Sequence, residues 1–206
     1  MQILNISLPI KPDSFYYPGT IPTEFESFNS KSGSSILTKI TTHSHAGSHV
    51  DAPKHAVGMT ASVDEYSDSN FYGACRVLDL SHLEKSITRS DLVGKSILKN
   101  ERILLKTRNS NRGFNKFYDD FIGLTSDAAV YLAEQEIMLI GIDWLGIKAN
   151  DASDNISHTA FFEKNIPILE GLNLAEALEA EYTLSAFPIA YVGIDGAQVA
   201  ARLIST

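Results

Sequence analysis

Short apolar runs, most of them too short for a helix, dominate the pattern along the chain. Residues 2–8 and 35–42 alternate apolar and polar side chains, a pattern that is typical of strands. Residues 102–106 and 137–142 are densely apolar, which is typical of strands buried on both faces. Three further segments have the composition of strands: residues 76–80, 182–190 and 191–194.

Helical patterns are fewer. Residues 125–127 form a typical N-terminal cap for a helix that reaches about residue 136. Residues 153–154 can cap a second helix that runs to about residue 164, and residues 174–178 suggest a short third one. Strands and helices without strict alternation predict a mixed α/β or α+β domain rather than a regular doubly wound sheet.

The chain has 206 residues, a length that one hydrophobic core can serve, so we expect a single domain over residues 1–206. Two stretches have the composition of long loops. Residues 11–23 contain Pro12, Pro18 and Pro22, and residues 106–123 are rich in Asn, Arg and aromatic side chains. Loops of this length in a compact domain often bind or cover a ligand.

The composition narrows the classes of function. A formal net charge of −8 argues against a nucleic-acid partner, because binding phosphates requires a cationic face. The longest apolar run, residues 137–142, is interrupted by Gly141 and is too short to cross a bilayer. Residues 1–5 lack the basic and apolar stretches of a signal peptide, so we expect a cytoplasmic protein with no membrane partner.

Four of the six histidines lie within residues 43–55, together with one aspartate. Because Cys75 is the only cysteine, a bound metal must be held by imidazole and carboxylate groups, which suit zinc, manganese or iron(II). His49 and Asp51 are two residues apart, so an extended strand would project both to one side. Chance clustering in a polar loop and a purely structural metal site are the alternatives to a catalytic centre.

Residues 45–55 resemble the His-x-Gly-Thr-His-x-Asp-x-Pro-x-His signature of the cyclase family of metal hydrolases, which includes bacterial kynurenine formamidases and isatin hydrolases. The one departure within the motif is Ser48, where threonine is usual, and it keeps the hydroxyl. The resemblance extends over most of the chain, through residues 17–19, 104–109, 140–143, 158, 168–172, 187–188 and 195–196.

This resemblance implies a mixed α/β fold of the swivelling β/β/α type, with a mixed sheet or barrel-like core and flanking helices. The metal ligands of the family fall here on His45, His49, Asp51, His158 and Glu170. They would hold two divalent ions, bridged by Asp51 and Glu170. Zinc is the metal that we expect, and manganese is the alternative. The family usually forms homodimers or homotetramers, and we expect the same here.

Two further residues take roles by resemblance. His55 matches the catalytic histidine, which we expect to act as general base toward water and then as general acid toward the leaving nitrogen. Tyr17 stands where formamidases often have a tryptophan that stacks on an aromatic substrate. The alternative interpretations are an orienting role for His55 and an ordinary loop anchor for Tyr17.

The implied activity is hydrolysis of a small amide, cyclic amide or lactone by metal-activated water, with N-formylkynurenine as the best specific substrate (arylformamidase activity). Isatin-like cyclic amides, other lactams, lactones and carbamates are alternatives, because Trp144 and Ala200 depart from the formamidase subgroup. An alternative of another class is a metal-dependent binding protein without catalysis. The presence of His55 argues against it, since a binder needs no general base.

Overall fold

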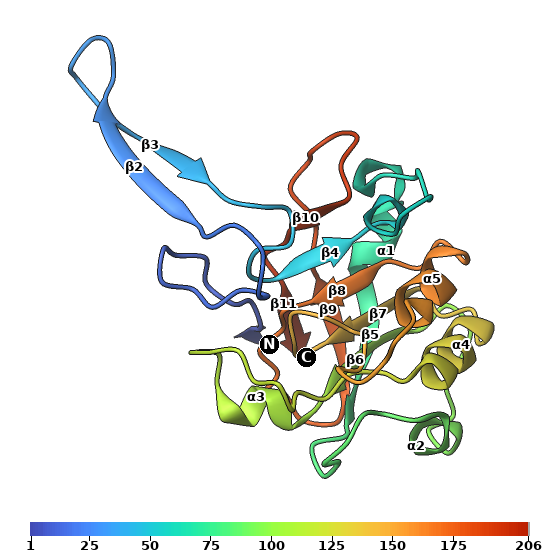
Figure 1. The fold of residues 1–206 in the computed structure, drawn as a ribbon. Coiled ribbons are helices and arrows are strands. Elements are labelled where there is room, and N and C mark those ends of the chain that lie inside the picture. Colours follow the sequence, from blue (N-terminus) through green and yellow to red (C-terminus); the bar gives the residue numbers. More distant parts are fainter. Residues whose placement is uncertain (206) are drawn as a thin grey trace.

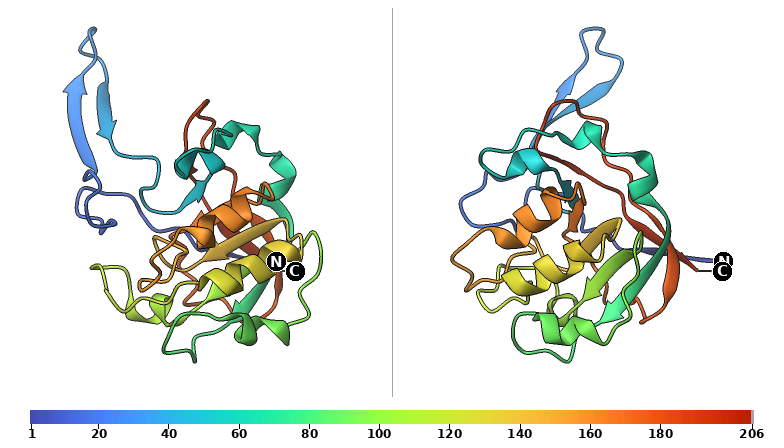
Figure 2. Two further views of the ribbon diagram at one scale, coloured as in Figure 1. Left: turned by 45° about the vertical axis from the view of Figure 1, so that its right-hand side comes forward. Right: turned by 90° about the vertical axis from the view of Figure 1, so that its right-hand side faces the viewer.

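The computed structural model describes residues 1–205, and its main feature is a nine-stranded sheet. The strand order is β1-β11-β9-β5-β6-β7-β8-β4-β10, and the sheet curls into a half-barrel (Figures 1 and 2). The strands are β1 (Gln2–Asn5), β4 (His49–Asp51), β5 (Tyr72–Asp79), β6 (Arg102–Lys106), β7 (Leu139–Ile142), β8 (Ile168–Glu170), β9 (Glu181–Ser185), β10 (Gly196–Gln198) and β11 (Arg202–Ser205). Strands β5 to β8 are mutually parallel and the outer strands pair antiparallel. The predicted mixed α/β class with flanking helices is confirmed.

Helices cover one face of the sheet. Helix α4 (Ser126–Glu134) lies beside α5 (Ile156–Phe162), and α2 (Arg89–Val93) packs next to α4 (Figure 2). The remaining helical segments are single turns: η1 (Pro53–His55), η2 (Val63–Glu65), α1 (Asp68–Phe71) and α3 (Arg108–Arg112).

Two apolar cores lie on opposite faces of the central strands. Along β6, Ile103 and Leu105 pack toward the helices, whereas Leu104 points into the curl of the sheet. In β7, Ile140 packs toward the helices and Leu139 points into the curl of the sheet. Both faces are therefore buried, which explains why these strands have dense apolar sequences. Burial on both faces also fixes the strand register, because a slip of one residue would exchange the two faces.

A separate hairpin, β2 (Glu24–Asn29) and β3 (Ile36–Thr41), forms its own two-stranded sheet. It projects away from the rest of the molecule (Figures 1 and 2), and every residue in both strands is exposed.

The structure confirms most predicted elements and corrects others. Predicted strands 102–106 and 137–142 correspond to β6 and β7, and the helix capped at residues 125–127 corresponds to α4. Residues 174–178 are not helical, since Leu174 and Ala177 instead anchor a turn in the inner core. Residues 191–194 are not a strand, because Gly193 has a positive φ of 78° that breaks extended backbone.

The predicted strands 76–80 and 182–190 are confirmed in part. Strand β5 covers residues 76–79 of the first range, and β9 covers only residues 182–185 of the second. The helix expected from residue 153 starts later, at Ile156. Within residues 1–205, none of the helices has the length and apolar character required to cross a bilayer.

Candidate metal centre

The centre is built on the antiparallel pairing of β4 with β8. In this register His49 lies directly opposite Glu170, and the His49 Nε2 atom is 3.3 Å from Glu170 Oε2. His49 Nε2 is also 3.3 Å from Asp51 Oδ1, while Val50 between them points into the inner core. The two-residue spacing therefore places His49 and Asp51 on one side of an extended strand, as the sequence predicted.

Two left-handed glycines let these strands approach. Gly47 has φ +63° and Gly171 has φ +67°, and a Cβ atom on Gly171 would lie 2.3 Å from the Gly47 carbonyl oxygen. The Ser48 hydroxyl donates to the Gly171 carbonyl at 2.5 Å and accepts from the Leu8 amide at 2.7 Å. The hydroxyl at position 48 thus ties β4 to the end of β8, which explains why serine serves where threonine is usual.

His45 and His158 approach the two carboxylates from different elements. His45, in the loop before β4, places its Nδ1 atom 2.7 Å from Asp51 Oδ1. His158, on α5, places Nε2 3.7 Å from Glu170 Oε1 and 4.0 Å from Asp51 Oδ2. These two distances are too long for direct hydrogen bonds. The structure therefore brings all five predicted ligands together, with His158 set back from the others.

The residues present fit a divalent cation. Asp51 and Glu170 are fully buried, and Asp51 Oδ2 has no hydrogen-bond partner among residues 1–205. A buried carboxylate oxygen without a partner is costly unless a cation faces it. His49, Asp51 and Glu170 form one close group of possible ligand atoms, and His45, Asp51 and His55 form another.

The electrostatics of the cluster also favour added positive charge. Burial alone would lower the pKa of His45, but Asp51 and Asp195 outweigh it and raise that pKa to about 10. Burial acts in the same way on His49, and the carboxylates of Asp51 and Glu170 raise its pKa to about 9. The carboxylates thus stabilise the protonated form of the neighbouring histidines, and a bound cation would balance the same negative charge.

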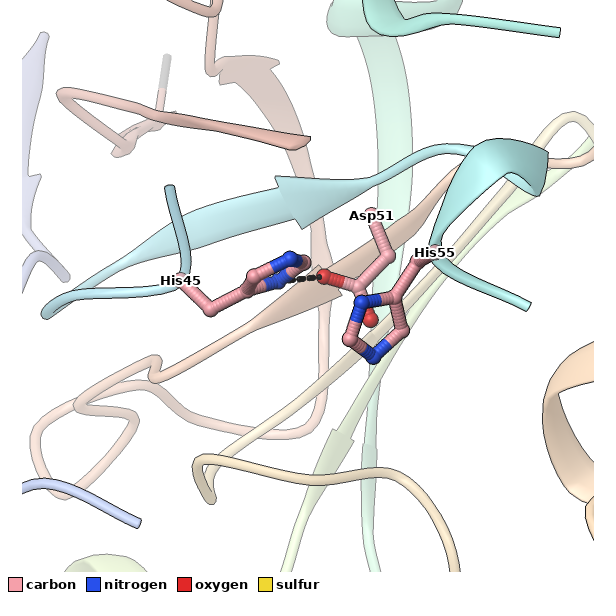
Figure 3. Close-up of side chains that lie close together, drawn as sticks. All are labelled: His45, Asp51 and His55. Carbon is pink, nitrogen blue, oxygen red and sulfur yellow. Dashed lines mark hydrogen bonds and ion pairs between the residues drawn. The ribbon is translucent and has the colours of Figure 1, made fainter. Parts of the chain in front are cut away.

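His55 and Tyr17 lie on the cavity that opens onto this cluster. The cavity has a volume of about 210 Å³ and is lined by Tyr17, Thr20, His45, His49, His55, Leu145, Gly146, Lys148, His158 and Glu170. The ring of His55 lies 4.1 Å from that of His45, and Figure 3 shows both rings directed toward Asp51. The His55 side chain is 37% exposed, against 1% for His49.

Sequence reasoning missed one residue of the site, Asp195. Its Oδ2 atom lies 2.8 Å from His45 Nε2 and 3.6 Å from His55 Nδ1. The hydrogen bond from His45 holds the pKa of Asp195 well below its usual range. In the sequence, residues 195–196 stand out only as a part of the family pattern, because the contact of Asp195 with His45 spans 150 positions along the chain.

Trp144 does not line the cavity. It is fully buried and contacts the rings of Phe15, Phe117 and Phe121, which makes it a packing residue behind the site.

The family assignment follows from comparison with known proteins. The sequence model of the family described as Cyclase matches residues 4–149. The chain belongs to the cyclase family. Among its relatives, the kynurenine formamidase of Bacillus mycoides is 34% identical over 202 residues, which is 97% of this chain and 96% of the relative. The kynurenine formamidase of Bacillus anthracis is also 34% identical, over 200 residues, which is 96% of this chain and 95% of the relative.

Solved structures agree with this assignment. One described as a potential metal-dependent hydrolase with cyclase activity is 28% identical and superposes on this cyclase with a TM-score of 0.87, covering 100% of this chain and 99% of the other. An isatin hydrolase bound to the product analogue thioisatinate superposes with a TM-score of 0.84 at 19% identity, covering 100% and 93% of the two chains. At that identity the isatin hydrolase shows a shared fold only.

Proposed function

We propose that this cyclase is a cytoplasmic, metal-dependent hydrolase of a small non-peptide amide, with N-formylkynurenine as its substrate. The observation that carries the proposal is that His55 and four of the five potential ligands line one cavity. The fifth ligand, Asp51, lies 2.7 Å from His45 and 3.3 Å from His49. The full-length similarity to kynurenine formamidases supports the choice of substrate. The lone Cys75, buried and without a disulfide partner, suits the proposed compartment.

In this proposal, five residues hold two divalent ions, and zinc is preferred over manganese. His45, His49 and Asp51 would bind one ion and His158 the other, with Asp51 and Glu170 as bridges. The ligand set supports this division, because a carboxylate offers two oxygens to two cations whereas a neutral imidazole binds one. The Ile147 amide donates to Glu170 Oε1 at 2.6 Å, which orients this carboxylate.

The reaction adds water to the formyl carbon, breaks its bond to nitrogen and yields formate and an amine. A divalent cation held by these residues would polarise the carbonyl and lower the pKa of a water molecule. His55 takes the proton from the attacking water as the new carbon–oxygen bond forms. It then returns that proton to the leaving nitrogen as the carbon–nitrogen bond breaks. Its position on the cavity beside His45 supports this role.

Tyr17 is proposed to stack on the aromatic ring of the substrate. Its ring lines the cavity near Gly146, and the centroids of the Tyr17 and Phe117 rings lie 5.1 Å apart in a T-shaped arrangement. Tyr17 is 39% exposed, so part of its ring is accessible for stacking on an aromatic substrate.

The test is turnover of N-formylkynurenine by protein loaded with zinc or manganese, with isatin assayed in parallel. Formation of kynurenine and formate at the same rate supports the proposal. Hydrolysis of isatin alone would keep the metal-dependent mechanism and replace the substrate. Binding of N-formylkynurenine without turnover of either compound would contradict the proposal and favour a metal-dependent binding protein.

We further propose that the chain forms homodimers or homotetramers through the β2–β3 hairpin. Phe25 pairs with Ile40, and Phe28 pairs with Leu37, yet all four side chains are between 44% and 61% exposed. An isolated two-stranded hairpin is marginally stable in water. Exposed apolar side chains on both of its faces therefore favour burial against a second copy of the chain.

A further inference from the structure

The Asp195 carboxylate contacts three side chains of the motif region. Its Oδ2 atom lies 2.8 Å from His45 Nε2 and 3.6 Å from His55 Nδ1, and its Oδ1 atom accepts a hydrogen bond from the Ser44 hydroxyl at 2.9 Å. One carboxylate therefore faces both a proposed ligand and the proposed acid–base residue. Among residues 1–205, no other carboxylate oxygen lies within 4.0 Å of a ring nitrogen of His55.

The backbone that carries Asp195 is fastened to the same part of the fold. The Ala52 amide, directly after β4, donates to the Asp195 carbonyl at 2.9 Å. The Lys54 ammonium group, in η1, donates to the Gly193 carbonyl at 2.6 Å, and the Gly193 amide donates to Asp64 Oδ1 at 2.8 Å. These bonds attach the carboxylate to the segment that carries Asp51 and His55, so its position relative to them is fixed.

Gly196 provides the clearance that this contact requires. A Cβ atom at position 196 would lie 2.9 Å from His45 Cε1 and 2.6 Å from the Val50 carbonyl oxygen. A larger residue would push the His45 ring away from β10. The Asp195-Gly196 pair thus combines the carboxylate with the space for the ring that it contacts.

We propose that Asp195 is a positioning residue that fixes the ring orientation of His45 and the tautomer of His55. By holding His45 Nε2, it directs Nδ1 of the same ring toward Asp51. Its Oδ2 atom, 3.6 Å from His55 Nδ1, is beyond direct hydrogen-bond distance, but its negative charge favours the tautomer with the proton on that nitrogen and leaves Nε2 unprotonated. The role for His55 rests on the proposed hydrolase function, whereas the role for His45 does not.

The test compares Asp195→Asn with Asp151→Asn, a control at an exposed aspartate in the turn before α5. Zinc affinity is measured by competition with a chromophoric chelator, and histidine tautomers are read from nitrogen-15 NMR of the zinc-loaded protein. For Asp195→Asn we expect a 10- to 100-fold loss of zinc affinity and partial conversion of His55 to the Nε2–H tautomer. The control should match the wild type in both measurements.

Ser44→Ala provides a second variant in case Asp195→Asn folds poorly, because it removes only the hydrogen bond to Oδ1. It should change zinc affinity and the His55 tautomer in the same direction, to a smaller degree. Wild-type zinc affinity and an unchanged His55 tautomer in folded Asp195→Asn would overturn the inference. Neither measurement requires turnover, so a failure of the proposed activity would be seen separately in the substrate assay.

Discussion

At the scale of single residues, His55 differs from the other histidines of the cluster. His49 is buried between two carboxylates, whereas His55 is partly exposed on the cavity wall. His55 nevertheless lies close enough to Asp51 and His45 to be a third ligand of a cation there. Exposure and access to the cavity favour proton transfer over ligation, and removal of the ring separates the two roles.

For His55→Ala we expect turnover to fall by about 10²- to 10⁴-fold with metal content unchanged, because a general acid–base residue contributes that much to rate. Metal content is measured by elemental analysis, and turnover is measured on the same preparation. His82→Ala is the matched control, since His82 lies outside the cavity lining. Loss of metal in His55→Ala would make His55 a ligand and contradict its assigned role.

Tyr17 and Tyr16 form a natural pair for testing the aromatic contact. The two side chains are similarly exposed, at 39% and 37%, but Tyr17 alone of the two lines the cavity. Tyr17→Ala should raise KM for N-formylkynurenine about 5- to 10-fold, the loss of roughly 1 kcal/mol of stacking. Tyr16→Ala should leave KM unchanged, and equal effects in steady-state kinetics would show that Tyr17 is only a loop anchor.

The site could be predicted from sequence where its geometry is local. The ligands of β4 and the motif around them lie within eleven residues, so their spacing alone indicates a shared face. His158 and Glu170 could be assigned only by resemblance, because their approach to Asp51 depends on the pairing of β4 with β8 and the packing of α5. Asp195 could not be assigned, since a loop between distant strands positions it.

At the scale of elements, strand prediction succeeded where burial on both faces gives a dense apolar run. It failed for β2, in which Phe25 and Phe28 are three residues apart and break the alternation of a strand. It also failed for β10, whose three residues are too few to show a period. Residues 174–178 have the composition of a helix but lie in a turn, because tertiary packing overrides a weak local preference.

The close approach of β4 and β8 can be tested at Gly171, with Gly33 as the control. Both glycines have positive φ, 67° and 69°, but an added Cβ meets backbone at Gly171 and open space at Gly33. For Gly33→Ala we expect a loss of about 1 kcal/mol in the free energy of unfolding, from backbone strain alone. For Gly171→Ala we expect about 3 kcal/mol or more, because the strands must separate. Urea denaturation measures both, and equal losses would show that the approach is not tight.

At the scale of the whole molecule, the β2–β3 hairpin connects the proposed assembly to the site. The chain enters the hairpin after Tyr17 and Thr20, which line the cavity, and leaves it shortly before His45. Burial of the hairpin against a second copy would therefore restrain both segments. In the proposed assembly, this connection would give the second copy a role in shaping the cavity.

Polar substitutions of the exposed apolar side chains in the β2–β3 hairpin should disrupt the proposed assembly. Replacing Phe25 and Ile40 together by serine should lower the mass measured by light scattering from that of an oligomer to that of a monomer, because an apolar contact is lost. Leu98→Ser, at an exposed leucine outside the hairpin, is the control and should keep the wild-type mass. A wild-type protein that is already monomeric would contradict the proposed assembly.

Metal stoichiometry tests the account most directly, because the buried carboxylates call for a bound cation and the proposed chemistry depends on one. Wild-type protein reconstituted with zinc or manganese and then desalted should contain about two ions per chain by elemental analysis. Chelation should lower its melting temperature, since metal at about 100 times its Kd adds about 2.7 kcal/mol to the free energy of unfolding. Asp51→Asn should retain neither ion. A wild-type chain that binds no divalent metal after reconstitution would contradict the account.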